Sequence, residues 1–299
     1  MNNTTELKTR IKIIKQTRQI TKAMHLISSA KMKRAMARYN SNLPYFQRVH
    51  SVLKEILEHS GNLQHRYFLP GTAERTAYLV IGSDRGLAGG YSQNLNNFAW
   101  EHMQGRNVVR LIAIGSLTAG FFLRKQQSID KTFMHLSQDP SLHNSRLIAA
   151  YLLDLFNRGI ADEIYLVYTD FVSAALQKNK AEKLLPLGLD MFGDVEASGK
   201  LQSDLEYFPS KDNVLEKLVP EYLIGAVYGA LVHSFTSEQS ARMNAMDSAT
   251  RNADELVNSL TLQYNRARQW GITEEIIEIS AGAEAHAEGS REHGSTANR

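Results

Sequence analysis

The stretch MDSATRNADELVNSLTLQYNRARQW, residues 246–270, decides the fold of this chain. Its small and apolar residues recur at spacings of three and four, which places them along one face of a long helix. Four of them stand seven apart, namely Met246, Ala253, Leu260 and Ala267, and they alternate with Ala249, Leu256, Gln263 and Trp270. A period of seven drives a helix to wind around a partner helix. The stretch therefore predicts one side of a coiled coil, within a helix expected from about residue 212 to residue 278.

The partner helix is expected at the other end of the chain, over residues 5–59. Its candidate seam consists of Ile13, Ile20 and Ile27, again seven apart, with Met24 and Ala30 between them. Because the chain returns to its own beginning, the two helices are predicted to pair as an antiparallel coiled coil. Proline removes a helical hydrogen bond, so we expect a kink or a short break at Pro44. Pro220 is expected in the first turns of the second helix, or else it splits off a short leading helix.

Between the two helices, short apolar runs alternate with amphipathic segments. The expected strands are residues 76–82, 108–115, 132–136, 163–168 and 182–187, and the expected helices are residues 92–104, 117–125 and 141–158. Strand–helix alternation with nearly continuous apolar strands is typical of a parallel α/β layer. The predicted fold class is therefore α/β: a Rossmann-like parallel-sheet domain inserted between two long terminal helices that form an antiparallel coiled coil.

This interpretation divides the chain into four segments. They are the N-terminal coiled-coil helix (1–60), the α/β globular foot domain (61–209), the C-terminal coiled-coil helix (210–280) and a tail (281–299). An irregular loop is expected over residues 188–210, which contain several glycines and a proline. The tail has no apolar pattern, so it is predicted to be disordered.

Composition narrows the possible functions. The chain has no cysteine, which excludes disulfides, thiolate metal sites and cysteine nucleophiles. The N-terminus lacks the apolar core of a signal peptide, so we expect a protein that is not exported. The longest apolar run, residues 222–232, is too short to span a bilayer, and its Gly225 and Gly229 predict close helix contacts.

Charge is distributed unevenly along the chain. The net charge is only +3, yet residues 1–57 carry twelve Lys and Arg against two acids, which gives +10 for that segment. Such a basic helix favours nucleic acid, an anionic membrane or an acidic protein surface as its partner. A nucleic-acid-binding protein is therefore one alternative, although the helix has few aromatic residues to stack on bases.

A glycine-rich turn, Gly82–Gly90, follows the first expected strand. In α/β proteins the free N–H groups of such a turn often bind phosphate. This turn lacks the Gly-Lys-Ser/Thr of the phosphate loop and the spacing of the dinucleotide fingerprint, so we interpret its glycines as serving backbone geometry. An α/β enzyme with a phosphate site here is the second alternative. The ten histidines show no metal-ligand spacing, and no catalytic, cofactor-binding or metal-binding residue is predicted.

Polar residues occupy seam positions of the second long helix. They are Arg242 and Gln263, with Gln239 one step earlier. Polar residues in a coiled-coil seam cost stability. The favoured interpretation is that this helix also meets a second protein, and the alternative is that the seam frays there.

Three blocks of the sequence carry a resemblance to a known family. Residues 6–35, ELKTRIKIIKQTRQITKAMHLISSAKMKRA, resemble the N-terminal helix of the gamma subunits of F-type ATP synthases. Residues 83–95, SDRGLAGGYSQNL, resemble the glycine turn of that family. Residues 237–279, from SEQSARM to EEIIEI, are similar to its C-terminal helix. The resemblance spans residues 5–282.

The resemblance implies a central rotor shaft that is not itself catalytic and binds no cofactor. In this family the paired terminal helices stand inside a ring of three alpha and three beta subunits, and the α/β domain binds the epsilon subunit and the membrane ring of c subunits. Ion flow turns the shaft, which drives ATP synthesis at the beta subunits, and hydrolysis turns it backward. The expected location is the cytoplasmic face of the bacterial inner membrane, with membrane association only through the complex and no nucleic-acid partner.

The resemblance also assigns individual residues. Those that match contacts with the alpha and beta subunits are Thr21, Lys22, Ala23, Met24, Arg242, Arg268, Gln269 and Thr273. Those that match the glycine turn of the foot domain are Ser83, Asp84, Arg85, Gly86, Gly89 and Gly90. The chain departs from the family at Ala88, where a cysteine is common, so a thiol switch is excluded at that position. It also departs in its polar tail, which stands where the family commonly has a small-residue or apolar tip.

Overall fold

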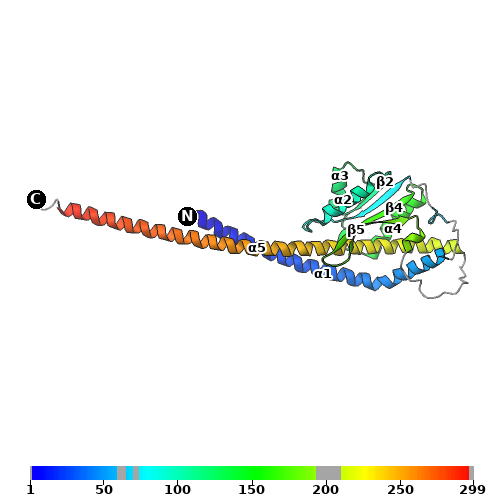
Figure 1. Cartoon of the computed structure of the whole chain (residues 1–299), viewed down its shortest axis with the longest axis horizontal. Helices are drawn as coiled ribbons and strands as arrows, with labels where there is room; N and C mark the ends of the chain where they lie inside the picture. The colour runs from blue at the N-terminus through cyan, green and yellow to red at the C-terminus, as the bar shows by residue number, and fades with distance from the viewer. Residues whose placement is uncertain (1, 59–64, 70–73, 193–209, 296–299) are drawn as a thin grey trace. The chain divides into compact units, whose positions relative to one another are not determined.

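The computed structural model describes residues 2–58, 65–69, 74–192 and 210–295 (Figure 1). The chain divides into two compact units. One unit joins the chain up to Met24 to the chain from Met246 onward, and the other is His25–Ala245. Both long helices cross this division, so each unit contains a segment of each helix.

The two long helices are α1, Asn2–Glu58, and α5, Lys211–Ser295. Pro44 lies inside α1 and Pro220 lies inside α5, and both helices continue through them. The break considered at Pro44 is therefore absent. The turns that follow Pro44 are held by side chains buried in the core, such as Leu53, and this packing offsets the hydrogen bond that proline removes.

α5 runs further than the sequence predicts. Its backbone is helical as far as Ser295, whereas residues 281–299 were predicted to form a disordered tail. Residues 296–299 lie outside the described part of the chain. The segment that follows Ser280 is rich in alanine and glutamate, which have high intrinsic helix propensity. The absence of an apolar pattern in residues 281–299 therefore gave no reason to expect packing, but it did not exclude a helical backbone.

In the unit formed by the chain up to Met24 and from Met246 onward, α1 and α5 pack in opposite directions. The hydroxyl oxygens of Thr21 and Thr250 lie 2.7 Å apart, and Arg18 Nε lies 2.5 Å from Asp254 Oδ1. A step backward along α1 corresponds to a step forward along α5, so the pair is antiparallel. This confirms the predicted coiled coil.

The seven-residue row predicted on α5 is confirmed. Its four members are buried or half-buried: Met246, Ala253, Leu260 and Ala267. The alternating row is wrong in part, because Leu256, Gln263 and Trp270 are exposed. Val257 and Tyr264 are half-buried in their place. The seam therefore advances by four residues and then three, whereas three and then four were predicted.

The row predicted on α1 lies on the wrong face. Ile13, Ile20 and Ile27 are more than half exposed. Six of the buried residues of α1 form a different row of the same period: Leu7, Thr21, Ser28, Ala35, Val49 and Ile56. Small side chains in the middle of this row let two helix axes approach closely, and isoleucine at those positions would hold them apart. Hydrophobicity suggested the isoleucines, but side-chain size decided the packing.

The unit His25–Ala245 contains a five-stranded sheet of order β3-β2-β1-β4-β5. Its strands are β1 Thr76–Ile81, β2 Val108–Ile114, β3 Lys131–Phe133, β4 Glu163–Phe171 and β5 Gln177–Leu185. All neighbours are parallel except β4 and β5, which are antiparallel. The link between them, residues 172–176, is too short for a parallel crossover. The sheet is therefore mostly parallel with one antiparallel edge, and β5 begins earlier than predicted.

Helices cover both faces of the sheet. They are α2 Tyr91–Met103, α3 Ser116–Arg124 and α4 Leu142–Asn157, and two short 3₁₀ turns are η1 Leu136–Gln138 and η2 Leu189–Phe192. Tyr78 and Val80 of β1 pack with Leu95 of α2 and Phe122 of α3. Leu79, which points to the other face, belongs to a larger core with α4 and the inner parts of α1 and α5. Most of the predicted loop over 188–210 lies outside the described residues.

The inner parts of the long helices share one core with the sheet. Ile56 of α1 and Val227 of α5 are almost completely buried in it. The predicted segment boundaries at residues 60 and 210 therefore cut through this unit. The close contact predicted for Gly225 is confirmed, because a Cβ there would lie 2.4 Å from Phe46 Cδ1. The contact at Gly229 is looser, with 3.6 Å to the Tyr39 ring.

Candidate functional site

The glycine turn connects the end of β1 to α2, and local packing and backbone conformation account for Gly82 and Gly89. A Cβ on Gly82 would lie 1.8 Å from Thr118 Oγ1. At the end of β2, a Cβ on Gly115 would lie 2.5 Å from the carbonyl oxygen of Ser83. Gly89 and Gly115 also have φ angles of +57° and +96°, which side chains disfavour. These constraints support the interpretation that the glycines serve backbone geometry.

Asp84 fastens the turn to the neighbouring elements. One carboxylate oxygen accepts the backbone N–H of Ser116 at 2.9 Å, and the other accepts the Ser137 hydroxyl at 2.6 Å. Partial burial pushes the pKa of this carboxyl upward. The hydrogen bonds to the carboxylate outweigh that effect, so the pKa of Asp84 lies below its ordinary value. Asp84 thus anchors the turn as an ionised acceptor.

A buried ion pair fastens the same turn to α5. Arg242 Nη2 lies 2.5 Å from Glu238 Oε1, and the two side chains are only 9% and 7% exposed. The same nitrogen donates to the carbonyl oxygens of Arg85 and Gly86, at 3.1 Å each. Burial raises the pKa of Glu238, although the Arg242 charge opposes the rise. The carbonyl oxygens that the turn presents here therefore accept hydrogen bonds from Arg242 of the same chain.

Serine hydroxyls extend the attachment along α5. Ser234 Oγ accepts the N–H of Thr169 and donates to the carbonyl oxygen of Ile81, both at 3.3 Å. Ser237 Oγ donates to the carbonyl oxygen of Thr169 at 3.2 Å, and Ser240 Oγ donates to the loop after β4 at 3.0 Å. We call Ser234, Ser237, Glu238, Ser240 and Arg242 the polar stripe of α5. It covers the carboxyl ends of β1 and β4, the edge where open α/β sheets usually bind ligands.

A charged cluster joins α5 to the antiparallel edge of the sheet. Asp170 of β4 lies 2.6 Å from His233 Nδ1 of α5 and 2.7 Å from Lys180 Nζ of β5. Burial pushes the pKa of Asp170 upward, but the hydrogen bond from Lys180 and the nearby His233 bring it below its ordinary value. The ionised carboxylate of Asp170 therefore links β4 to both β5 and α5.

The arrangement suits mechanical attachment. Hydrogen bonds and ion pairs are directional, so the polar stripe fixes both the rotation and the height of α5 against the sheet. Among the residues that the structure describes, no group of three histidine or acidic side chains is placed to hold a metal ion.

The predicted contact residues fall into two classes. Lys22, Ala23, Arg268, Gln269 and Thr273 are exposed, and Met24 is half-buried. Arg242 instead points into its own unit, and Thr21 is buried against Thr250. The exposed contact residues predicted on α1 do not lie beside those predicted at residues 268–273, because Arg268 lies about 27 Å beyond Thr250, the partner of Thr21, along α5 at ~1.5 Å per residue.

Sequence reasoning identified Arg242 as an unusual seam residue but missed the rest of the polar stripe. A signal was available. Ser234, Ser237 and Ser240 are three residues apart, directly after the apolar run 222–232, and Glu238 stands four residues before Arg242. Spacings of three and four place side chains on one helix face, and an acid four residues before a base is a favourable pair.

Known proteins resemble this chain over almost its whole length. A family model described as ATP synthase matches residues 3–286. The ATP synthase gamma chain of Alkaliphilus metalliredigens is 42% identical over 281 residues, covering 94% of this chain and 97% of the relative. That of Ruminiclostridium cellulolyticum is 43% identical over 291 residues, covering 95% of this chain and 99% of the relative.

Solved structures share the fold at lower identity. A chain of the Euglena gracilis mitochondrial ATP synthase, from the OSCP/F1/c-ring in rotational state 3, has a TM-score of 0.70 at 22% identity, covering 97% of this chain and 96% of that chain. A chain of the central stalk and c ring of the Tetrahymena thermophila enzyme has a TM-score of 0.60 at 22% identity, covering 77% of this chain and 99% of that chain. With the family model and the full-length relatives, the chain belongs to the ATP synthase gamma chain family, the non-catalytic rotor subunits of F-type ATP synthases.

Proposed function

We propose that this rotor subunit couples ion flow through a membrane c ring mechanically to ATP synthesis or hydrolysis at the beta-subunit sites. The observation that carries the proposal is the attachment of α5 to the sheet through the polar stripe. α5 is helical from Lys211 to Ser295 and belongs to both units of the chain. A torque on the sheet passes into that helix through directional bonds between packed elements, not through a flexible linker.

The proposed partners are three alpha and three beta subunits around the coil, with the epsilon subunit and the c ring at the α/β domain. The similar Tetrahymena chain comes from a central stalk with its c ring, and the similar Euglena chain comes from an assembly of OSCP, F1 and c ring. The relatives with the highest identity above are bacterial. We therefore place this chain at the cytoplasmic face of a bacterial inner membrane, as a peripheral protein held there by its complex.

The proposed contacts with alpha and beta subunits are the predicted residues whose side chains are available: Lys22, Ala23, Met24, Arg268, Gln269 and Thr273. Polar contacts of modest strength suit a shaft that must move past its neighbours. Thr21 and Arg242 have partners within the chain, so we propose that Thr21 holds α1 against α5 and that Arg242 holds α5 against the glycine turn.

The assembly test is co-expression with alpha and beta subunits from the same source, followed by native mass spectrometry and an ATPase assay. A complex of three alpha subunits, three beta subunits and one copy of this chain is expected, with ATPase activity that depends on this chain. If the alpha and beta subunits fold and assemble but this co-expressed chain does not join them, the proposal is contradicted.

The contact test uses R268A/Q269A in the assembled enzyme. We expect the variant to assemble but to lose most of its coupled ATP synthesis. R251A/N252A is the matched control, because both residues are exposed on the same helix outside the proposed contacts. Equal synthesis in all three enzymes would show that Arg268 and Gln269 have no role in coupling.

A further inference from the structure

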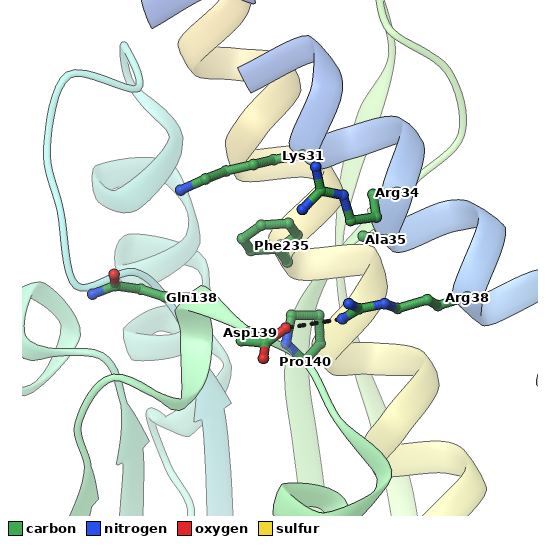
Figure 2. Close-up of a pocket in the computed structure, with 8 residues that line it drawn as sticks. All are labelled: Lys31, Arg34, Ala35, Arg38, Gln138, Asp139, Pro140 and Phe235. Atoms are coloured by element: carbon green, nitrogen blue, oxygen red, sulfur yellow. Dashed lines mark hydrogen bonds and ion pairs between the residues drawn. The ribbon is translucent and has the colours of Figure 1, made fainter. Parts of the chain in front are cut away.

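A basic pocket lies between α1, the segment before α4, and α5 (Figure 2). α1 contributes the cations Lys31, Arg34 and Arg38, residues 138–140 form the opposite wall, and Phe235 of α5 forms the floor. The cavity has a volume of about 280 Å³. Ligand pockets commonly measure about 300–1,000 Å³, so this one suits a small ligand.

The pocket holds more positive than negative charge. Arg38 Nη1 lies 3.1 Å from Asp139 Oδ1, and this pair closes one side. In the part of the chain that the structure describes, neither Lys31 nor Arg34 is within salt-bridge distance of an acid. The charge of Lys31 acts on the carboxyl of Glu238, but that carboxyl is already held in the buried pair with Arg242. Among the described residues, therefore, Lys31 and Arg34 have no ion-pair partner of their own at the cavity.

This arrangement is unfavourable for an empty pocket. Residues 31, 34 and 38 are spaced by three and four, so their like charges lie on one face of α1 and repel. In Figure 2, Arg34 and Arg38 point from α1 toward Phe235 and Asp139, and Lys31 extends past Phe235 to the side where Gln138 lies. Phe235 and Ala35 are each only 6% exposed, so the floor of the pocket is apolar, while the three cations above it remain exposed to solvent. An anion in the cavity would relieve the repulsion.

We infer that this pocket binds a phosphoryl group, supplied either as free phosphate or as the terminal group of a nucleotide. Arg34 can offer paired N–H donors to two phosphate oxygens, and Lys31 supplies a compact charge. A phosphoryl dianion neutralises both unpaired cations, whereas a carboxylate neutralises one. The Arg38–Asp139 pair is exposed and contributes little by itself, so Arg38 is free to turn toward the ligand.

The test is isothermal titration of the purified full-length chain with inorganic phosphate, and separately with ADP, at a constant ionic strength of about 0.15 M. K31Q/R34Q is the test variant, and both residues are exposed, so the fold should be retained. K33Q/R48Q is the matched control, because it removes the same charge from exposed positions of α1 outside the pocket.

We expect one phosphate per chain, with affinity at least about tenfold lower in K31Q/R34Q and unchanged in K33Q/R48Q. Tighter binding of ADP than of phosphate would identify a nucleotide as the source of the group, and equal binding would identify the phosphate itself. Three outcomes would overturn the inference: no saturable binding to the wild-type chain, equal loss in both variants, or equal competition by acetate or a glutamate-containing peptide. The inference goes beyond the proposed coupling function, and the assembly test is independent of it.

Discussion

Replacing Arg242 with methionine tests how firmly α5 is held to the sheet. The substitution keeps an unbranched side chain, but it leaves Glu238 buried without its cation. It also removes the donor from the carbonyl oxygens of Arg85 and Gly86. Removing one partner of a buried ion pair costs about 3–5 kcal/mol. Since the whole free energy of unfolding of a domain is about 5–15 kcal/mol, R242M should lose a large part of it.

Urea unfolding of the purified chain measures this loss, and Trp100, which packs against the core beside the sheet, reports it by fluorescence. With a slope of about 2 kcal/mol per M, a loss of about 3 kcal/mol lowers the midpoint by about 1.5 M. R251M is the matched control, because the Arg251–Asp247 pair has the same spacing but side chains that are 70% and 55% exposed. Its free energy of unfolding should change by less than about 1 kcal/mol.

The double variant E238M/R242M separates the ion pair from the bonds to the turn. It should be more stable than R242M, because no charge is left buried alone, yet less stable than the wild type, because two carbonyl oxygens still lack a donor. A midpoint for R242M within about 0.3 M of the wild type would refute the reasoning. So would a double variant that is no more stable than R242M.

Three further predictions follow from the packing and the charges. G225A should lower the free energy of unfolding by about 1–3 kcal/mol, because its Cβ would lie 2.4 Å from Phe46 Cδ1; F46L should restore part of the loss, and urea unfolding with no loss would contradict the contact. Ile14 is half-buried and Ile13 is 55% exposed, so I14S should lower the melting temperature while I13S changes stability by less than about 0.5 kcal/mol; equal losses would show that the helix register is wrong. The pKa of Asp84 is lowered in the folded chain, so its carboxylate stabilises the fold above the unfolded pKa of about 3.9, and this stabilisation is lost as pH falls through the folded value. Urea titrations between about pH 6 and pH 3 should therefore show that the free energy of unfolding falls less in D84N than in the wild type. Identical pH profiles would count against Asp84 as the anchor of the turn.

Periodicity predicted the elements of this fold well, because each has a strong local pattern. The strands at 76–81 and 108–114 are nearly continuous apolar runs, and the helix between them ends just before Gly105. The direction of β5 was not predictable from its own residues. It depends on the length of the link 172–176, and the sequence pattern placed the start of that strand too late to reveal how short the link is.

The site was less predictable than the fold. The absence of the two common phosphate-binding patterns led us to interpret the glycines of the turn as a matter of backbone geometry, and the close contact at Gly82 and the φ angle of Gly89 support this. The partner of Arg242 was not predicted, since an arginine at a seam position can form an ion pair within its own chain as readily as a contact with another protein. Only the position of Glu238 and the carbonyls of residues 85 and 86 distinguishes the two cases, and that position depends on long-range packing.

The contact of α5 with the sheet and the exposed isoleucine row of α1 differ in a way that suits a rotor. Where α5 meets the sheet, directional hydrogen bonds and a buried ion pair fix a single orientation. Along α1, by contrast, Ile13, Ile20 and Ile27 stay on the outer face, because small residues such as Thr21 fill the seam. Apolar contact is non-directional and depends mainly on the area covered, so it changes little as one surface turns past another. We therefore expect the isoleucine row to lie against the subunits that surround the turning shaft, and the polar stripe to lie where the shaft must not slip.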